Sequence, residues 1–150
     1  MYKCCIFDLD GTLINSIKAI AYSCNLTLKK YNLGPIDEDT YKILVGDGYE
    51  KLIERALIHC GDNNLENYED ALVTYMEYFK IHCMHEVKAY DGIHDMLYFL
   101  KKNNIKIAVL SNKPATLYIF VVSNISSLLN CGKIDVILFD SIVFPHPGGP

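Results

Sequence analysis

Two aspartates, Asp8 and Asp10, close an apolar run near the start of the chain, and Gly11 and Thr12 follow them directly. Residues two apart in an extended chain point the same way, so both carboxylates are predicted to point to one side while Leu9 faces the other. The apolar run is typical of a strand buried on both faces of a parallel sheet, and open α/β sheets place their sites at the carboxyl ends of such strands. The pair is therefore a candidate catalytic centre.

Neighbouring carboxylates of this kind suit phosphoryl transfer. Two like charges this close resist simultaneous ionisation, and a cation such as Mg²⁺ offsets the repulsion by taking oxygen ligands from both. An ionised Asp8 can attack phosphorus to form an aspartyl phosphate, while Asp10 protonates the leaving oxygen and later deprotonates water. The competing interpretation is a plain turn whose side chains accept backbone hydrogen bonds. The apolar strand before the pair and the Thr-Leu after it favour the catalytic interpretation.

The helical and strand patterns of the chain are separated along the sequence. Residues 16–85 carry apolar residues at helical spacing, and helices are expected at about 16–31, 37–45, between residue 48 and Gly61, and at 65–85. Outside this block, strands are predicted at 4–8, 105–110 and 134–139, with helices near 93–100 and, weakly, 117–125, and a loop at 145–150. The pattern predicts an α/β fold: a Rossmann-like parallel sheet core of residues 1–15 and 86–150, with an inserted all-α helical cap of residues 16–85. The insert leaves and re-enters above the two acids, the position of a lid.

Composition narrows the classes of function. The net charge of −4 gives no basic footprint for nucleic acid, and no run of eighteen apolar residues predicts a membrane span. No secretory signal is apparent, and the six scattered cysteines form no C-x-x-C pair, so they are predicted to be reduced thiols of a cytoplasmic protein. A zinc site at His82, Cys83 and His85 is disfavoured because no second cluster accompanies them.

Residues 7–13, FDLDGTL, closely resemble the first motif of the haloacid dehalogenase-like phosphohydrolases. The resemblance implies that Asp8 is the nucleophile and that Asp10 is the acid/base, which also lends a backbone oxygen to Mg²⁺. It thereby makes Asp8 and Asp10 the expected metal ligands, and it places Thr12 with the phosphate-binding groups. The true dehalogenases of the superfamily lack the second acid, so Asp10 favours phosphate chemistry.

The cap segment Val45-Gly46-Asp47-Gly48 resembles the V-G-x-G segment of the phosphoglycolate-phosphatase-like branch, and residues 89–93 resemble that branch's return to the core. Gly46 and Gly48 have two interpretations: a simple break between cap helices, or a flexible loop that reaches the substrate. The resemblance, which spans about residues 2–114, favours the substrate loop.

Ser111, Asn112 and Lys113 follow the predicted strand at 105–110 and resemble the family's second motif, whose hydroxyl and nearby amide bind the phosphoryl group. A small hydroxyl at a strand end, followed by amides that open toward a helix start, is also physically suited to phosphate. Lys113 adds a positive charge, or it faces solvent. The alternative is that Ser111 and Asn112 only cap the next helix, with Pro114 at its first position. Two acids on a neighbouring strand favour the phosphate cradle.

Two later parts of the family's site have no counterpart at the expected places. A Lys motif is expected near residue 145, where Pro145-His146-Pro147 stands, and an acidic pair that completes the Mg²⁺ shell is expected beyond residue 150. These departures predict a truncated or altered carboxyl terminus and weak or absent activity. The strand that bears the acidic pair normally pairs beside the first strand, so an open sheet edge and self-association through it are also expected.

The sequence therefore predicts a Mg²⁺-dependent phosphatase, a phosphoric monoester hydrolase, that acts on a small phosphorylated metabolite. The resemblance suggests phosphoglycolate as the substrate. Two alternatives stay open: a phosphomutase of the β-phosphoglucomutase kind, and a non-catalytic residual domain that binds phosphate.

Overall fold

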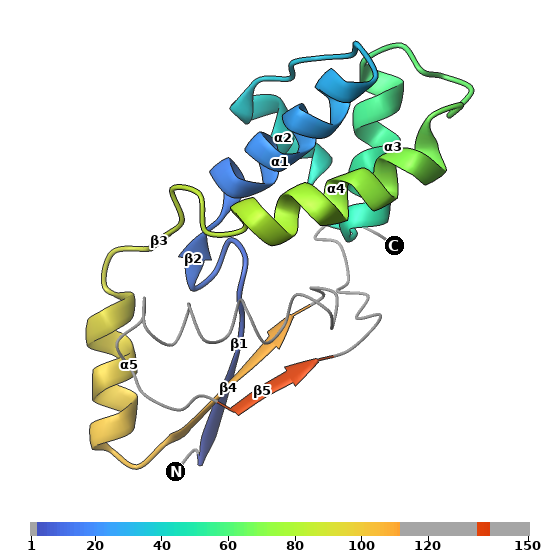
Figure 1. Cartoon of the computed structure of the whole chain (residues 1–150). Helices are drawn as coiled ribbons and strands as arrows, with labels where there is room; N and C mark the ends of the chain where they lie inside the picture. Colours follow the sequence, from blue (N-terminus) through green and yellow to red (C-terminus); the bar gives the residue numbers. More distant parts are fainter. Residues whose placement is uncertain (1–2, 112–134, 139–150) are drawn as a thin grey trace, which may run out of the picture.

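The computed structural model describes residues 3–111 and the backbone of residues 135–138. The described elements, in chain order, are β1 (Cys4–Asp8), β2 (Ile14–Asn15), α1 (Ile17–Lys30), α2 (Glu38–Leu44), α3 (Tyr49–His59), α4 (Tyr68–His82), β3 (Lys88–Ala89), α5 (Ile93–Lys102), β4 (Lys106–Ser111) and β5 (Asp135–Leu138). Helices α1–α4 gather beyond the carboxyl end of β1, and α5 lies beside the sheet (Figure 1). The expected helix at 117–125 and the tail at 145–150 lie outside the described residues.

The three core strands form a parallel sheet in the order β1-β4-β5. Asp8 pairs with Leu110 across β1 and β4, and Ser111 pairs with Leu138 across β4 and β5. The α/β class with a parallel sheet, predicted from strands that alternate with helices, is confirmed. The strand expected at 105–110 runs one residue further, so Ser111 belongs to the sheet and does not follow it.

One face of β1 is open, which corrects the prediction of a strand buried on both faces. Ile6 is 58% exposed and Cys4 is also exposed, whereas Phe7 packs against the core. Successive residues of a strand point to opposite faces, so Cys4 and Ile6 share the open one. Apolar residues on both sides of a strand therefore do not show by themselves that both sides are covered.

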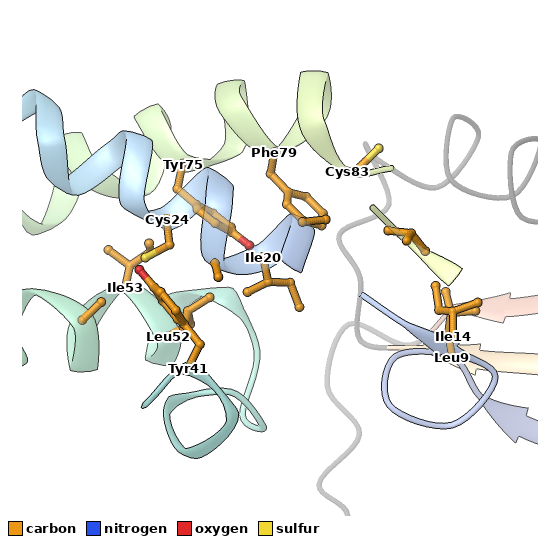
Figure 2. Close-up of a cluster of buried hydrophobic side chains, with 14 of the residues drawn as sticks. Leu9, Ile14, Ile20, Cys24, Tyr41, Leu52, Ile53, Tyr75, Phe79 and Cys83 are labelled. Carbon is orange, nitrogen blue, oxygen red and sulfur yellow. The ribbon is translucent and has the colours of Figure 1, made fainter. Parts of the chain in front are cut away.

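The helical segment between the strands has its own buried core. Helix α1 packs along α4, and α3 also packs against α4. Figure 2 shows side chains from these helices and α2 meeting in one cluster, among them Cys24, Tyr41, Ile53 and Tyr75, while Leu9 and Ile14 lie nearer the sheet. The buried Tyr41 hydroxyl donates to Asn25 Oδ1 at 2.9 Å, so its polar end is satisfied.

Local hydrogen bonds explain where two of these helices begin. The Asp37 carboxylate accepts the Thr40 amide at 2.9 Å and so caps α2, which starts at the next residue. Helix α4 begins at Tyr68, later than the predicted start at Leu65. The reason is that the Asp62 carboxylate accepts the amides of Glu66 and Asn67, at 2.9 and 3.1 Å, and holds this stretch in a turn.

A two-stranded antiparallel pair, β2 with β3, lies where the chain leaves the sheet and where it returns. Ile14 pairs with Ala89, and Asn15 pairs with Lys88. The sequence did not predict this pair, because two-residue strands show no periodicity. Helices α1–α4 all lie within residues 16–85, and the division into core and cap at those boundaries stays a prediction. Within the described part of the chain, no helix is both long and apolar enough to cross a membrane.

Candidate active site

Asp8 and Ser111 occupy the same edge of the sheet. Asp8 is the last residue of β1, Ser111 is the last of β4, and the parallel register places Ser111 one position beyond the partner of Asp8. Ser111 is buried, and the half-buried Asp8 accepts its neighbour Leu9's amide at 2.7 Å. The fold thus brings two of the predicted site residues, 103 positions apart, to adjacent strand ends. Asn112 and Lys113 lie outside the described residues.

The chain turns immediately after Asp8, and this turn sets the place of Asp10. The Leu9 carbonyl accepts the amides of Leu13 and Ile14 at 3.0 and 3.1 Å, and the Gly11 amide donates to the Ile14 carbonyl at 2.9 Å. Gly11 has a φ of +79°, which glycine adopts far more readily than other residues. The strand therefore ends before Asp10. The extended spacing that predicted a common direction for the two carboxylates does not hold beyond Asp8.

The buried Ser16 contacts the second acid directly. Its hydroxyl donates to Asp10 Oδ1 at 2.5 Å. Ser16 occupies the N-cap position of α1, but its side chain makes no capping hydrogen bond. Asn15 Oδ1 accepts the Ile17 amide instead, at 3.3 Å. Ser16 is thus a site residue that the sequence analysis missed, because a serine before a helix is ordinarily a cap.

A cavity of about 250 Å³ lies beside Asp10, between the turn after β1 and the helical segment. Its lining combines the turn, helix α1, the end of α2 and the connection from β3 to α5. The polar lining residues are Asp10, Asn15, Ser16, Lys42 and Tyr90. Ile17, Ile20 and Val45 form the apolar part of the wall. The acid/base candidate therefore lines a partly open cavity, whose walls include residues of the turn and of the helical segment.

Three further predicted site residues in the described part of the chain do not line this cavity. Thr12 is exposed in the turn, and Gly46 and Gly48 follow Val45 without joining the lining. The Gly46–Gly48 segment is instead held from α3: Arg55 donates to the Leu44 carbonyl at 3.0 Å and to the Asp47 carboxylate. The assignments of Thr12 to phosphate and of the two glycines to a substrate loop stay predictions.

The oxygen donors at this edge suit Mg²⁺. This ion usually keeps several waters and takes one or two carboxylates together with substrate phosphate oxygens. Asp8 and Asp10 supply that number, and among the described residues no three His, Cys, Asp or Glu side chains gather as a metal site. His82 and His85, the alternative zinc ligands, both pack on the Tyr22 ring, with ring centroids 5.0 and 4.2 Å away.

Comparison with known proteins agrees with the geometry. A family model described as "Haloacid dehalogenase-like hydrolase" matches residues 5–142. This chain belongs to the haloacid dehalogenase-like hydrolase family. The phosphoglycolate phosphatase of Colwellia psychrerythraea is 37% identical over 114 residues, which cover 73% of this chain and 50% of that protein. Phosphoglycolate phosphatase 1 of Pseudomonas aeruginosa is 34% identical over 114 residues, which cover 73% and 41%.

A solved structure extends the likeness to the fold. The crystal structure of a predicted phosphoglycolate phosphatase from Haemophilus somnus matches with a TM-score of 0.75 and 26% identity, over 97% of this chain and 66% of that one. Within the family, these relatives place the chain in the phosphoglycolate-phosphatase-like branch. The chain spans about half the length of the curated relatives that it matches.

Proposed function

We propose that this chain carries the phosphate-ester site of a phosphatase, with Asp8 as the nucleophile and Asp10 as the acid/base. The observation that carries the proposal is the placement of Asp8 at the end of β1, one strand from the buried Ser111, with Asp10 in the next turn facing a cavity. Membership of a hydrolase family and relatives that are named phosphoglycolate phosphatase support the same activity.

In the proposed reaction, an Asp8 carboxylate oxygen attacks phosphorus. A bond forms between that oxygen and phosphorus, the ester P–O bond breaks, and Asp10 gives its proton to the leaving oxygen. Water then attacks phosphorus of the aspartyl phosphate, and Asp10 takes the water's proton. The bond between the Asp8 oxygen and phosphorus breaks, which releases inorganic phosphate and regenerates the Asp8 carboxylate. The Ser111 hydroxyl donates to a phosphoryl oxygen. Mg²⁺, held by the Asp8 carboxylate and the Asp10 backbone oxygen, would supply positive charge against the phosphoryl oxygens.

The size of the cavity supports a small substrate. At about 250 Å³ it lies below the range of roughly 300–1,000 Å³ that is typical of pockets for drug-sized ligands. A small phosphorylated metabolite fits this volume, and phosphoglycolate is our proposed example because the relatives carry that name.

The helical segment of residues 16–85 acts, in this proposal, as a cap over a core of residues 1–15 and 86–150. Lys42 and Val45 already reach the cavity from α2, which supports a lid that excludes water around Asp10. Thr12, Asn112 and Lys113 complete the phosphate-binding set in the proposal, and Gly46 and Gly48 give the cap its substrate loop.

Two broader proposals concern the setting of the protein. Strand β1 ends the described three-stranded sheet, and Ile6 on it is 58% exposed, which supports self-association through this edge. Cys4, Cys5, Cys24 and Cys60 carry thiols that form no disulfide within the described residues, which supports a reducing compartment such as the cytoplasm.

The test is the Asp8→Asn variant, assayed with p-nitrophenyl phosphate and Mg²⁺. Loss of the nucleophile should lower kcat by about 10⁴-fold or more, since removal of a single catalytic residue has effects of this order. Asp70→Asn, an exposed carboxylate in the first turn of α4, is the matched control and should leave kcat unchanged. Measurable turnover by Asp8→Asn at the wild-type rate would contradict the proposal.

A further inference from the structure

The proposed reaction fixes where the leaving group must lie. Asp10 protonates the leaving oxygen, so the part of the substrate beyond that oxygen occupies the space beside Asp10. That space is the cavity lined by Asp10, Ser16, Lys42 and Tyr90. The phosphoryl group itself belongs at the strand ends, near Asp8 and Ser111, neither of which lines the cavity. The walls of the cavity therefore contact the leaving group, and their chemistry decides which esters bind.

The two ionisable groups on these walls come from different parts of the fold. Among the described lining residues, Asp10, the proton donor of the proposed reaction, lies on the core side, and Lys42 carries a positive charge on the cap side. The rest of the wall is apolar or neutral, with Ile17, Val45 and the Tyr90 phenol among its members. A leaving group with an anionic end would be attracted by Lys42, which orients it with that end toward α2.

The ion pair that Lys42 forms in this structure is weak enough for its partner to be exchanged. Its ammonium donates to Asp39 Oδ1 at 2.6 Å, three residues earlier on α2, and the two side chains are 57% and 88% exposed. Exposed ion pairs at this spacing contribute little to stability, so a substrate carboxylate can replace or share Asp39 without disturbing the fold. Lys42 thus lines the cavity, and its ammonium is not locked into the interior.

We propose that Lys42 is a specificity-determining residue, whose ammonium binds a carboxylate on the leaving group and so selects small phosphorylated carboxylic acids over neutral phosphate esters. This inference rests on the proposed phosphatase function and names the substrate class of that site. Because Lys42 contacts a group far from the breaking bond, it binds substrate and transition state alike. Its loss should therefore raise KM and leave kcat nearly unchanged.

The experiment compares 2-phosphoglycolate with ethyl phosphate, a similarly small ester without the carboxylate, for the full chain with Mg²⁺. Lys42→Met should raise KM for 2-phosphoglycolate roughly five- to tenfold and change KM for ethyl phosphate less than about twofold, as expected for one exposed charge contact. Lys42→Arg should recover much of the loss because it keeps the charge.

Lys51→Met is the matched control. Lys51 pairs with Glu54 at 2.6 Å with the same three-residue spacing on α3, is 55% exposed, and does not line the cavity. It should leave both KM values unchanged. Equal effects of the two Lys→Met changes, or an equal rise in KM for both esters in Lys42→Met, would overturn the inference.

Equilibrium binding of the same two compounds by calorimetry separates this inference from the proposed function. If Asp8→Asn retains full turnover, the proposed function fails whatever Lys42 does. If the chain binds 2-phosphoglycolate more tightly than ethyl phosphate and Lys42→Met removes the difference, the inference stands even where turnover is absent. If Lys42→Met leaves that difference intact, the inference fails although the phosphatase proposal survives.

Discussion

The hydrogen bond from Ser16 to Asp10 offers a sharp test of how the site is built. Ser16→Ala removes the hydroxyl of a residue that is 2% exposed and leaves the Asp10 carboxylate without that donor. The change adds no new atoms, so it cannot overpack the site. Two effects are expected: a lower free energy of unfolding, and a lower kcat because Asp10 is no longer held toward the cavity.

The size of the stability loss follows from the burial of the pair. A hydrogen bond to a charged group contributes about 1.5–3 kcal/mol to stability. Asp10 is only half-buried, so water can replace part of the lost contact. We therefore expect the free energy of unfolding to fall by about 1–2 kcal/mol. For a chain of this length, that corresponds to a fall in Tm of a few degrees.

Ser23→Ala is the matched control on the same helix. Ser23 is 0% exposed, and its hydroxyl donates to the Ala19 carbonyl at 2.8 Å, a neutral acceptor. Its removal should cost about 0.5–1 kcal/mol and should leave kcat unchanged, because Ser23 lies away from the cavity lining. The two serines thus share residue type and burial. Ser16 directly precedes α1 and Ser23 lies within it, and their hydroxyls differ in the acceptor.

Urea unfolding at pH 7, followed by circular dichroism, measures the loss for Ser16→Ala, Asp10→Ala and the double variant. The double-mutant cycle isolates the coupling between the two side chains, which we expect to be about 1 kcal/mol or more. A coupling near zero, or a Ser16→Ala kcat equal to that of Ser23→Ala, would refute the positioning role of Ser16.

Two further predictions concern thiol chemistry and the sheet edge. Burial raises the pKa of the Cys24 thiol to about 12. At pH 8, iodoacetamide should therefore label the exposed Cys4 quickly and Cys24 only after unfolding in urea. Mass spectrometry measures the labelling, and similar labelling of both cysteines in the native protein would contradict this prediction. In the unfolded chain the Cys24 thiol has a pKa near its ordinary value of 9.0, whereas in the folded chain it stays protonated up to about pH 12. The free energy of unfolding should therefore fall as the pH rises from about 9 toward 12, because only the unfolded chain loses this proton there. If β1 mediates self-association, Ile6→Lys should shift the gel-filtration profile toward monomer, whereas a wild-type chain that is monomeric at every concentration tested would exclude that proposal.

The elements that the sequence predicted correctly depend on local patterns. The helical spacing of apolar residues in α1 and the apolar run that ends at Asp8 each act within a few residues, so their effects can be read along the chain. The misjudged boundary at Leu65 also had a local cause, the Asp62 turn, but the side-chain hydrogen bonds that make it are not visible in apolar spacing. The open face of β1 was missed because covering a strand depends on distant elements.

Local chemistry by itself determined the identity of the acids, the turn behind them and the helical nature of the segment that follows. Only the tertiary structure decided that Ser111 ends up beside Asp8, that Ser16 binds Asp10 and does not cap a helix, and that Lys42 faces the same cavity as Asp10. The physical reason is that which residues lie close together depends on strand register and helix packing between segments that are separated along the chain. Periodicity specifies which face of an element is buried, but not which partner covers it.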